Sequence, residues 1–200
     1  MSNDLSNQPD DLTAPERAQI DASTSGAVLL FFGSAAFWLV FGSLLEVVGS
    51  IQLVFPGFLD GLSFLTYGRV VQAATTVLAY GFATPAAIGI AIWLTARLSK
   101  VPLRHHRMLI SAGIVWNLGI LVGACSFIAG NSTSFALLAL PAFATPILFV
   151  SYALIAIWVL FTFNERKSGA LFVSAWFVFT AILAFPWLFG TANALLVWNP

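Results

Sequence analysis

Residues 65–82 read LTYGRVVQAATTVLAYGF, with a single arginine, Arg69, at the start of an otherwise largely apolar run. The run continues to residue 98, and a helix of about 20 apolar residues is enough to cross the bilayer core of about 30 Å. A charged side chain at the edge of such a helix is costly unless it finds a partner, a ligand or the headgroup region. Four and five residues after Arg69, the predicted helix carries only the methyl groups of Ala73 and Ala74. The stretch predicts a transmembrane helix.

The composition of the whole chain indicates an integral membrane protein. Of its 200 residues, 60% are hydrophobic and only 8% are charged, and the mean hydropathy is +0.94. Soluble domains carry about a quarter of their residues as Asp, Glu, Lys and Arg. The zero net charge and the lack of a basic stripe argue against a nucleic-acid partner. Cys125 is the only cysteine, which excludes an intrachain disulfide and a cysteine-based metal cluster.

Apolar runs long enough to span a bilayer occur five times in the chain. The expected fold is therefore an all-α polytopic transmembrane bundle, in which the lipid bilayer surrounds the helices. Residues 1–23 are polar and acidic and are expected to form a mobile tail, whose last part caps the first helix. Residues 24–200 then form one transmembrane domain. Its predicted spans are residues 26–55, 68–98, 108–129, 142–163 and 170–190.

The basic residues are distributed asymmetrically over the connections between these spans. The first and third connections contain no Lys or Arg, and Arg69 lies only at the start of the span that follows the first connection. The second and fourth connections are basic. The positive-inside rule places the basic connections in the cytoplasm. Five spans then put the N-terminus inside and the C-terminus outside. The basic residues of these two connections are Arg97, Lys100, Arg104, Arg107, Arg166 and Lys167.

Small residues and prolines indicate how the helices pack. The pair Gly119-x-x-x-Gly123 predicts a close approach of two helices, as do small residues in the first span. Prolines within the second and fifth spans predict irregularities in those helices. The small residues of the first span are Gly42, Gly49 and Ser50, and the two prolines are Pro85 and Pro186.

Glu46 and Asn117 are candidates for a buried polar or proton-conducting site. A carboxylate within the first span should be protonated, paired or exposed to a wet cavity. Glu46 is therefore either a proton-relay group, the partner of Arg69, or a neutral acid that is hydrogen-bonded between helices. Asn117 lies near the middle of the third span and is expected to hydrogen-bond across a helix interface.

The remaining charged and metal-binding side chains allow simpler interpretations. Arg69 can reach the headgroups, bind an anionic group, or pair with Glu46 or Asp60. His105 and His106 are adjacent and flanked by arginines, so they are expected at the surface rather than on one metal ion. The chain has no Ser–His–Asp set, phosphate loop or carboxylate cluster. The residues alone therefore predict no catalytic site and no metal site.

Several stretches in their order resemble the N-terminal part of subunit I of haem–copper oxidases, in the cbb-type (C-family) branch. These stretches are FWLVFGSLLEVVGSIQLVFPGFL, LTYGRVVQAATTVLAYGF, WNLGILVG, PILFVSYALIAIWVLFTF and VSAWFVFTAILAFPWLFGTANALL. The resemblance covers nearly the whole chain from about residue 20 onward. It implies a bacterial-type inner membrane, haem b and copper as family cofactors, and other subunits of a respiratory oxidase as partners.

The chain departs from this family where the family holds its cofactors. In the family, the second helix begins Gly-Arg-x-Arg-Pro-x-His, and the histidine is an axial ligand of the low-spin haem. Gly68 and Arg69 match this motif and Arg69 would lie on the propionate side, but the histidine position falls on Ala74. A methyl group cannot bind iron, so we expect no cofactor in this chain.

Two further departures point in the same direction. Relatives carry a glutamate pair in the third connection, near a bound calcium, where this chain has Ala136 and Ala139. Alanine side chains offer no oxygen to a hard cation. The remaining haem and copper ligands of the family belong to later helices, which follow the position of Pro200.

These observations lead to three expectations for function. The first is a non-catalytic, oxidase-derived subunit of a respiratory terminal oxidase or another electron-transfer complex, which is not an enzyme on its own. The second is the N-terminal part of a split or truncated cytochrome c oxidase subunit I, which reduces oxygen and pumps protons together with a second chain. The third is a carrier for a small molecule or ion, built on Glu46 and Asn117.

Overall fold

The computed structural model describes residues 12–133, 135, 137–167 and 173–198. All regular elements within these ranges are helical, and five helices are long and apolar enough to cross a membrane. This confirms the all-α transmembrane bundle that the sequence predicts. The helices are α1 (Ala14–Val54), α2 (Tyr67–Thr76) continued by the π-helix η1 (Val77–Ala83) and α3 (Thr84–Ser99), α4 (His106–Ile128), α5 (Thr145–Asn164) and α6 (Val173–Trp198).

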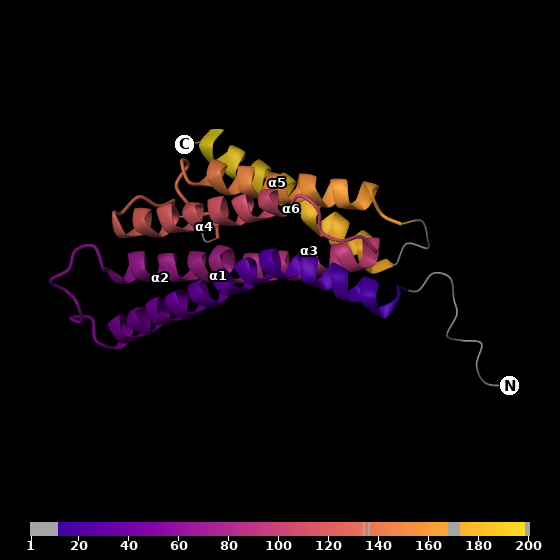
Figure 1. Ribbon diagram of the computed structural model, residues 1–200. Helices are drawn as coiled ribbons and strands as arrows, with labels where there is room; N and C mark the ends of the chain where they lie inside the picture. Colours follow the sequence, from indigo (N-terminus) through magenta and orange to yellow (C-terminus); the bar gives the residue numbers. More distant parts are fainter. Residues whose placement is uncertain (1–11, 134, 136, 168–172, 199–200) are drawn as a thin grey trace.

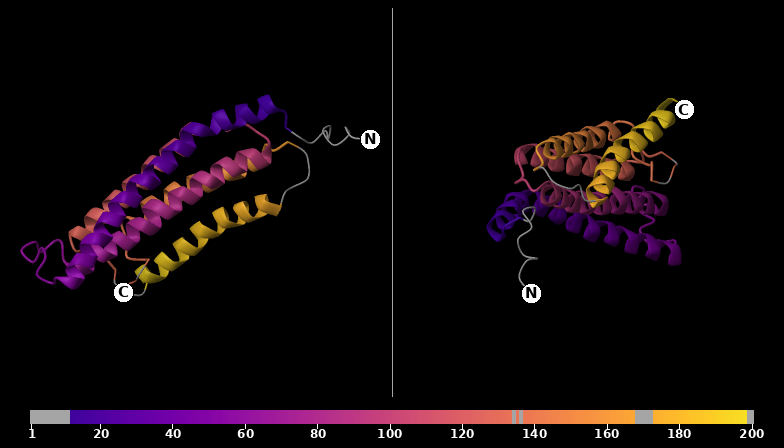
Figure 2. Two further views of the ribbon diagram at one scale, coloured as in Figure 1. Left: turned by 90° about the horizontal axis from the view of Figure 1, so that it is seen from below. Right: turned by 90° about the vertical axis from the view of Figure 1, so that its right-hand side faces the viewer.

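The helices form two layers that run along a common axis (Figure 1). The continuous helix α2–η1–α3 packs along α1 in one layer, and α4 packs against α5 in the other. Contacts of α2 with α4, and of α3 with α5, join the two layers. α6 packs against α5 and α3, so that α1 and α6 lie at opposite edges of the bundle (Figure 2).

α1 begins earlier than the predicted span because its N-terminus is capped. The backbone N–H and the hydroxyl of Thr13 donate to Glu16 Oε2 at 2.9 and 2.8 Å, an arrangement that satisfies a free N–H group at a helix start. Residues 14–23 are therefore helical, whereas we expected them to belong to a polar tail. Residues 1–11 of that tail lie outside the described ranges. At about 1.5 Å per residue, α1 is about 60 Å long, well beyond the bilayer core.

Glycines bring the helices together at most of the positions that the sequence predicts. A Cβ atom added to Gly42 or Gly49 of α1 would lie 2.8 Å from side-chain atoms of Leu78 or Val71, respectively. On α4, a Cβ atom at Gly119 would lie 2.7 Å from the side chain of Leu148 in α5. A Cβ atom at Gly123 would lie 2.5 Å from Leu140, which belongs to the connection before α5, so Gly123 accommodates that connection and not a helix. Ser50 differs from this expectation, because it is exposed on α1 instead of buried in a helix contact.

The irregularity expected at Pro85 takes the form of the π-helix η1. Proline has no N–H group for the helix ladder, and directly before it the Thr84 N–H bonds to the carbonyl of Ala79, five residues back. The Trp116 indole N–H of α4 donates to the Tyr80 carbonyl at 2.8 Å. The wide turn is thus fixed by a hydrogen bond from the other layer. Pro186 lies inside α6.

Candidate functional site

Arg69 joins the start of α2 to the end of α4. Its Nη1 atom donates to the carbonyls of Ser63 and Ile128, each at 3.1 Å. Ile128 is the last residue of α4, where helix carbonyls lack partners within the helix and favour a nearby cation. Within the described residues, Arg69 forms no ion pair with Glu46 or Asp60. The structure therefore gives Arg69 backbone partners, which the sequence analysis did not consider.

Two further side chains of the second span bind the connection between α4 and α5. Gln72 Nε2 donates to the Thr133 carbonyl at 2.6 Å, and the Tyr80 hydroxyl donates to the Leu137 carbonyl, also at 2.6 Å. The Thr133 N–H in turn donates to the carbonyl of Ala139, which is buried. Ala136, the other predicted departure in this connection, lies outside the described residues. Gln72 and Tyr80 hold the connection against the bundle.

Ala73 and Ala74 are packed in the protein interior, and Ala74 is 0% exposed. α2 lies between α1 and α4 at this level. An imidazole at residue 74 would need space that the neighbouring helices occupy, and the alanine itself has no lone pair for iron. Ala74, which the resemblance assigns to the haem-ligand position, therefore does not fit a haem iron.

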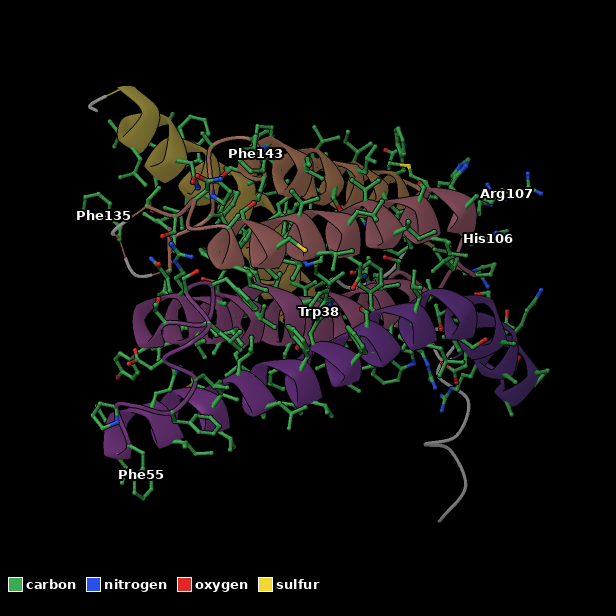
Figure 3. The ribbon with its side chains drawn as sticks, turned by 90° about the vertical axis from the view of Figure 1, so that its left-hand side faces the viewer. Trp38, Phe55, His106, Arg107, Phe135 and Phe143 are labelled. Atoms are coloured by element: carbon green, nitrogen blue, oxygen red, sulfur yellow. The ribbon has the colours of Figure 1, made fainter. Side chains whose placement is uncertain are left out.

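The other candidate ligands lie far from this position. His106 and Arg107 lie at one end of the bundle, and Phe55, Phe135 and Phe143 lie at the other (Figure 3). His105 and His106 are exposed there, as the sequence predicts. No group of three or more His, Cys, Asp or Glu side chains in the described part of the chain is arranged to hold a metal ion.

Asn117 forms the predicted hydrogen bond across a helix interface. The Trp38 indole N–H of α1 donates to Asn117 Oδ1 at 2.7 Å, and Asn117 Nδ2 donates to the Gly113 carbonyl at 2.7 Å. Both polar ends of the asparagine are thus used for packing. Figure 3 shows Trp38 midway along the bundle.

Glu46 is not brought together with Asn117. It follows Trp38, the partner of Asn117, by eight residues of α1, which corresponds to about 12 Å along the helix. The Glu46 side chain is half-buried and has no hydrogen bond or ion pair with any residue that the structure describes. The two side chains do not converge on one site, as a carrier built on them would need.

The basic end of the bundle, which carries Arg97, Lys100, Arg104, Arg107, Arg166 and Lys167, is tied together by ion pairs. Arg97 donates two hydrogen bonds of 2.7 Å to Asp21, and Lys167 lies 3.0 Å from Glu16. Both acids precede residue 26 and lie outside the predicted span. The Thr13 backbone N–H and Lys167 lower the pKa of Glu16 to about 2. Hydrogen bonds from Arg97 lower the pKa of Asp21.

Two apolar grooves lie beside α6. One, of about 610 Å³, is formed by α3, α5 and α6 and contains Tyr152. The other, of about 630 Å³, lies between α5 and α6 and contains Thr145 and Asn193, which hydrogen-bond to each other at 3.3 Å. Such concave apolar surfaces suit lipid chains or further helices. They contain none of the predicted site residues.

The fold and these contacts define a helical membrane protein. Residues 26–200 match the family described as Cytochrome C and Quinol oxidase polypeptide I, and the chain belongs to this family. It is 22% identical over 168 residues to a cytochrome c oxidase subunit 1 homolog of Azorhizobium caulinodans, covering 81% of this chain.

These comparisons confirm the resemblance to subunit I of haem–copper oxidases. The chain spans only 29% of the length of its Azorhizobium relative. Assignment to the cbb-type branch remains a prediction. The family binds haem and copper, whereas Ala74, which the resemblance to the family motif assigns to a haem-ligand position, is buried and offers only a methyl group.

Proposed function

We propose that this protein is a non-catalytic member of the subunit I family, which associates with a respiratory terminal oxidase or another electron-transfer complex. The observation that carries the proposal is the full burial of Ala74, which the resemblance to the family motif assigns to a haem-ligand position. Around it, Arg69 and Gln72 bind backbone carbonyls. These side chains stabilise the helix bundle through backbone carbonyls, and the methyl group of Ala74 cannot bind iron.

We further propose a multi-pass location in a bacterial-type inner membrane, with the N-terminus in the cytoplasm. α1 begins at the basic end of the bundle, and α6 ends at the opposite end (Figure 1). Basic residues are enriched on the cytoplasmic side of membrane proteins. The accessibility of cysteines introduced at the two ends tests this orientation. A membrane-impermeant thiol reagent added outside should react with cysteines at the basic end only after the membrane is permeabilised.

Purification from native membranes tests the accessory role. The chain should co-purify with membrane subunits that carry haem, and the haem should remain with those subunits when the chain is removed by mild detergent. The isolated chain should show no Soret band after incubation with haem. A low-spin b-type spectrum with one haem per isolated chain would contradict the proposal.

The alternative is that the chain forms part of a split or truncated subunit I, which reduces oxygen and pumps protons with a second polypeptide. The match of the family over residues 26–200 supports this alternative. Co-expression with a helical chain that bears the missing histidine ligands separates the two functions. Oxygen consumption that requires both chains would support the split enzyme, whereas activity that is independent of this chain would support the accessory role.

A further inference from the structure

Glu46 is a carboxylate on a membrane-spanning helix without a partner among the described residues. It precedes the end of α1 at Val54 by eight residues, or about 12 Å of helix. Glu46 lies between Gly42 and Gly49, where the α1 backbone touches the side chains of η1 and α2. The contact is too tight to hold the acid, so its side chain is half-buried at the edge of the contact.

A carboxyl group in this place needs a donor, and the part of the chain that the structure describes provides none. Acidic side chains in membrane segments usually face the bundle interior or water, or are paired, because burial in hydrocarbon is costly. The cation nearest to Glu46 in sequence, Arg69, is engaged by the carbonyls of Ser63 and Ile128. Six of the other basic residues belong to the basic end, and Arg17 binds the Leu12 carbonyl at the start of α1.

The helix face next to Glu46 has the features of a helix-docking surface. Ala36, Ser43 and Ser50 recur every seven residues and are all exposed, so they form one stripe along α1. Glu46 lies three residues after Ser43 and four before Ser50, on the adjoining side of that stripe. Small residues of this kind allow close approach of a second helix in lipid.

The edge position of α1 leaves this face accessible. α1 packs against α2, η1, α3 and α4 through the adjoining face, which carries the buried residues Phe31, Ala35, Trp38 and Gly42, and Glu46 lies at the border between this face and the exposed stripe. Figure 2 shows α1 at one edge of the bundle, away from α6. Large apolar side chains flank the stripe, among them Val47, which is 55% exposed.

We propose that the α1 face formed by Ser43, Glu46, Val47 and Ser50 docks a transmembrane helix of another polypeptide, and that this helix carries a lysine or arginine opposite Glu46. The charge of the acid selects the cation, and the two serines let the backbones approach. The inference rests on the proposed function only in that it requires a partner chain in the membrane.

Site-specific photo-crosslinking in the native membrane tests the proposal. A benzophenone amino acid replaces Val47, and a control probe replaces Leu118 of α4, which is similarly exposed at 52%. Mass spectrometry of the crosslinked peptide should identify a transmembrane segment with a lysine or arginine within about one helical turn of the crosslink. The Leu118 probe should give mainly lipid adducts.

The charge dependence of the crosslink decides whether Glu46 is the anchor. Glu46→Gln should lower the yield at Val47 about tenfold, as expected for a strong polar contact between membrane helices, while Glu46→Asp should retain most of it. Replacing the mapped cation by leucine should give the same loss. Exchange of the two charges, with Glu46→Lys and glutamate in the partner, should restore the crosslink.

Several outcomes would overturn the docking face. These are adducts with lipid only, with a second copy of this chain or with a segment that lacks a cation, and a yield that Glu46→Gln leaves unchanged. A loss of thermal stability of the isolated chain in Glu46→Gln would also overturn it, because the acid would then have a partner within the chain. A crosslink to a cationic helix in a complex that contains no oxidase or other electron-transfer subunit would support the docking face and contradict the proposed function.

Discussion

The side-chain amide of Gln72 lies 2.6 Å from the carbonyl oxygen of Thr133 and thereby joins the second span to the connection between α4 and α5. The resemblance to the family motif implies a proline at this position in related oxidases, and proline has no side-chain donor. In this chain the glutamine supplies a tertiary contact that closes the bundle between the second span and the connection after α4.

Replacement of Gln72 by leucine should release this connection. A single hydrogen bond of this kind contributes about 1 kcal/mol, so Gln72→Leu should lower the free energy of unfolding by that amount. Hydrogen exchange of residues 129–144 should become faster while exchange in α1 stays unchanged. Thr75→Val is the matched control on the same helix, because the exposed Thr75 hydroxyl bonds only to the Val71 carbonyl. Equal exchange in both variants would show that Gln72 does not hold the connection.

Restoring a histidine at residue 74 should not restore a haem site. Ala74 is 0% exposed, so the larger and polar imidazole should destabilise the bundle by about 1–3 kcal/mol through overpacking alone. The opposite axial ligand is also missing from this part of the chain, and Ala74→His should give no bis-histidine spectrum on incubation with haem. Thr75→His, which is exposed, serves as the control for stability. A six-coordinate low-spin spectrum specific to Ala74→His would contradict this prediction.

The number and approximate position of the spans follow from the sequence, because bilayer thickness imposes a minimum length on an apolar helix. The close helix contacts at Gly42, Gly49 and Gly119 were predictable for a similar reason, since small residues mark where helices approach in lipid. Gly123 instead contacts Leu140 in the connection before α5. The start of α1 was not, although Thr13 and Glu16 have the spacing of a capping box. The polar and acidic composition of residues 1–23 predicted a tail, and this prediction was preferred to the helix start that the capping-box spacing indicates.

The partners of Arg69 could not be predicted from the sequence. They are backbone carbonyls, and their positions depend on where α4 ends and on how the first connection folds back. Gln72 offered a weak signal, because it lies three residues after Arg69 and shares its helix face. Its acceptor in the connection between α4 and α5 has no sequence pattern of its own.

Gly130 should be sensitive to substitution because it adopts a left-handed conformation against Arg69. Its φ angle is +87°, and a Cβ atom there would lie 2.7 Å from Arg69 Nη2. Gly130→Ala should therefore cost about 1 kcal/mol for the backbone conformation alone, with an additional loss as Arg69 is displaced from the Ile128 carbonyl. Gly61→Ala is the control, since no heavy atom lies within 4 Å of its added Cβ. Thermal unfolding in detergent measures both, and equal stability of the two variants would refute the role of Arg69 at the end of α4.

The hydrogen bond between Trp38 and Asn117 should appear as a coupling energy in a double-mutant cycle. Trp38→Phe and Asn117→Leu each remove one partner, and their effects on the free energy of unfolding should be non-additive by about 0.6–1.7 kcal/mol. Trp38 also packs against the backbone of Gly81, but that loss occurs in both arms of the cycle and cancels. The control cycle pairs Asn117→Leu with Trp93→Phe, whose indole bonds to Asp21 at the basic end. This control should be additive within error, and a Trp38–Asn117 coupling no larger than the control would mean that the indole and the amide contribute to packing independently.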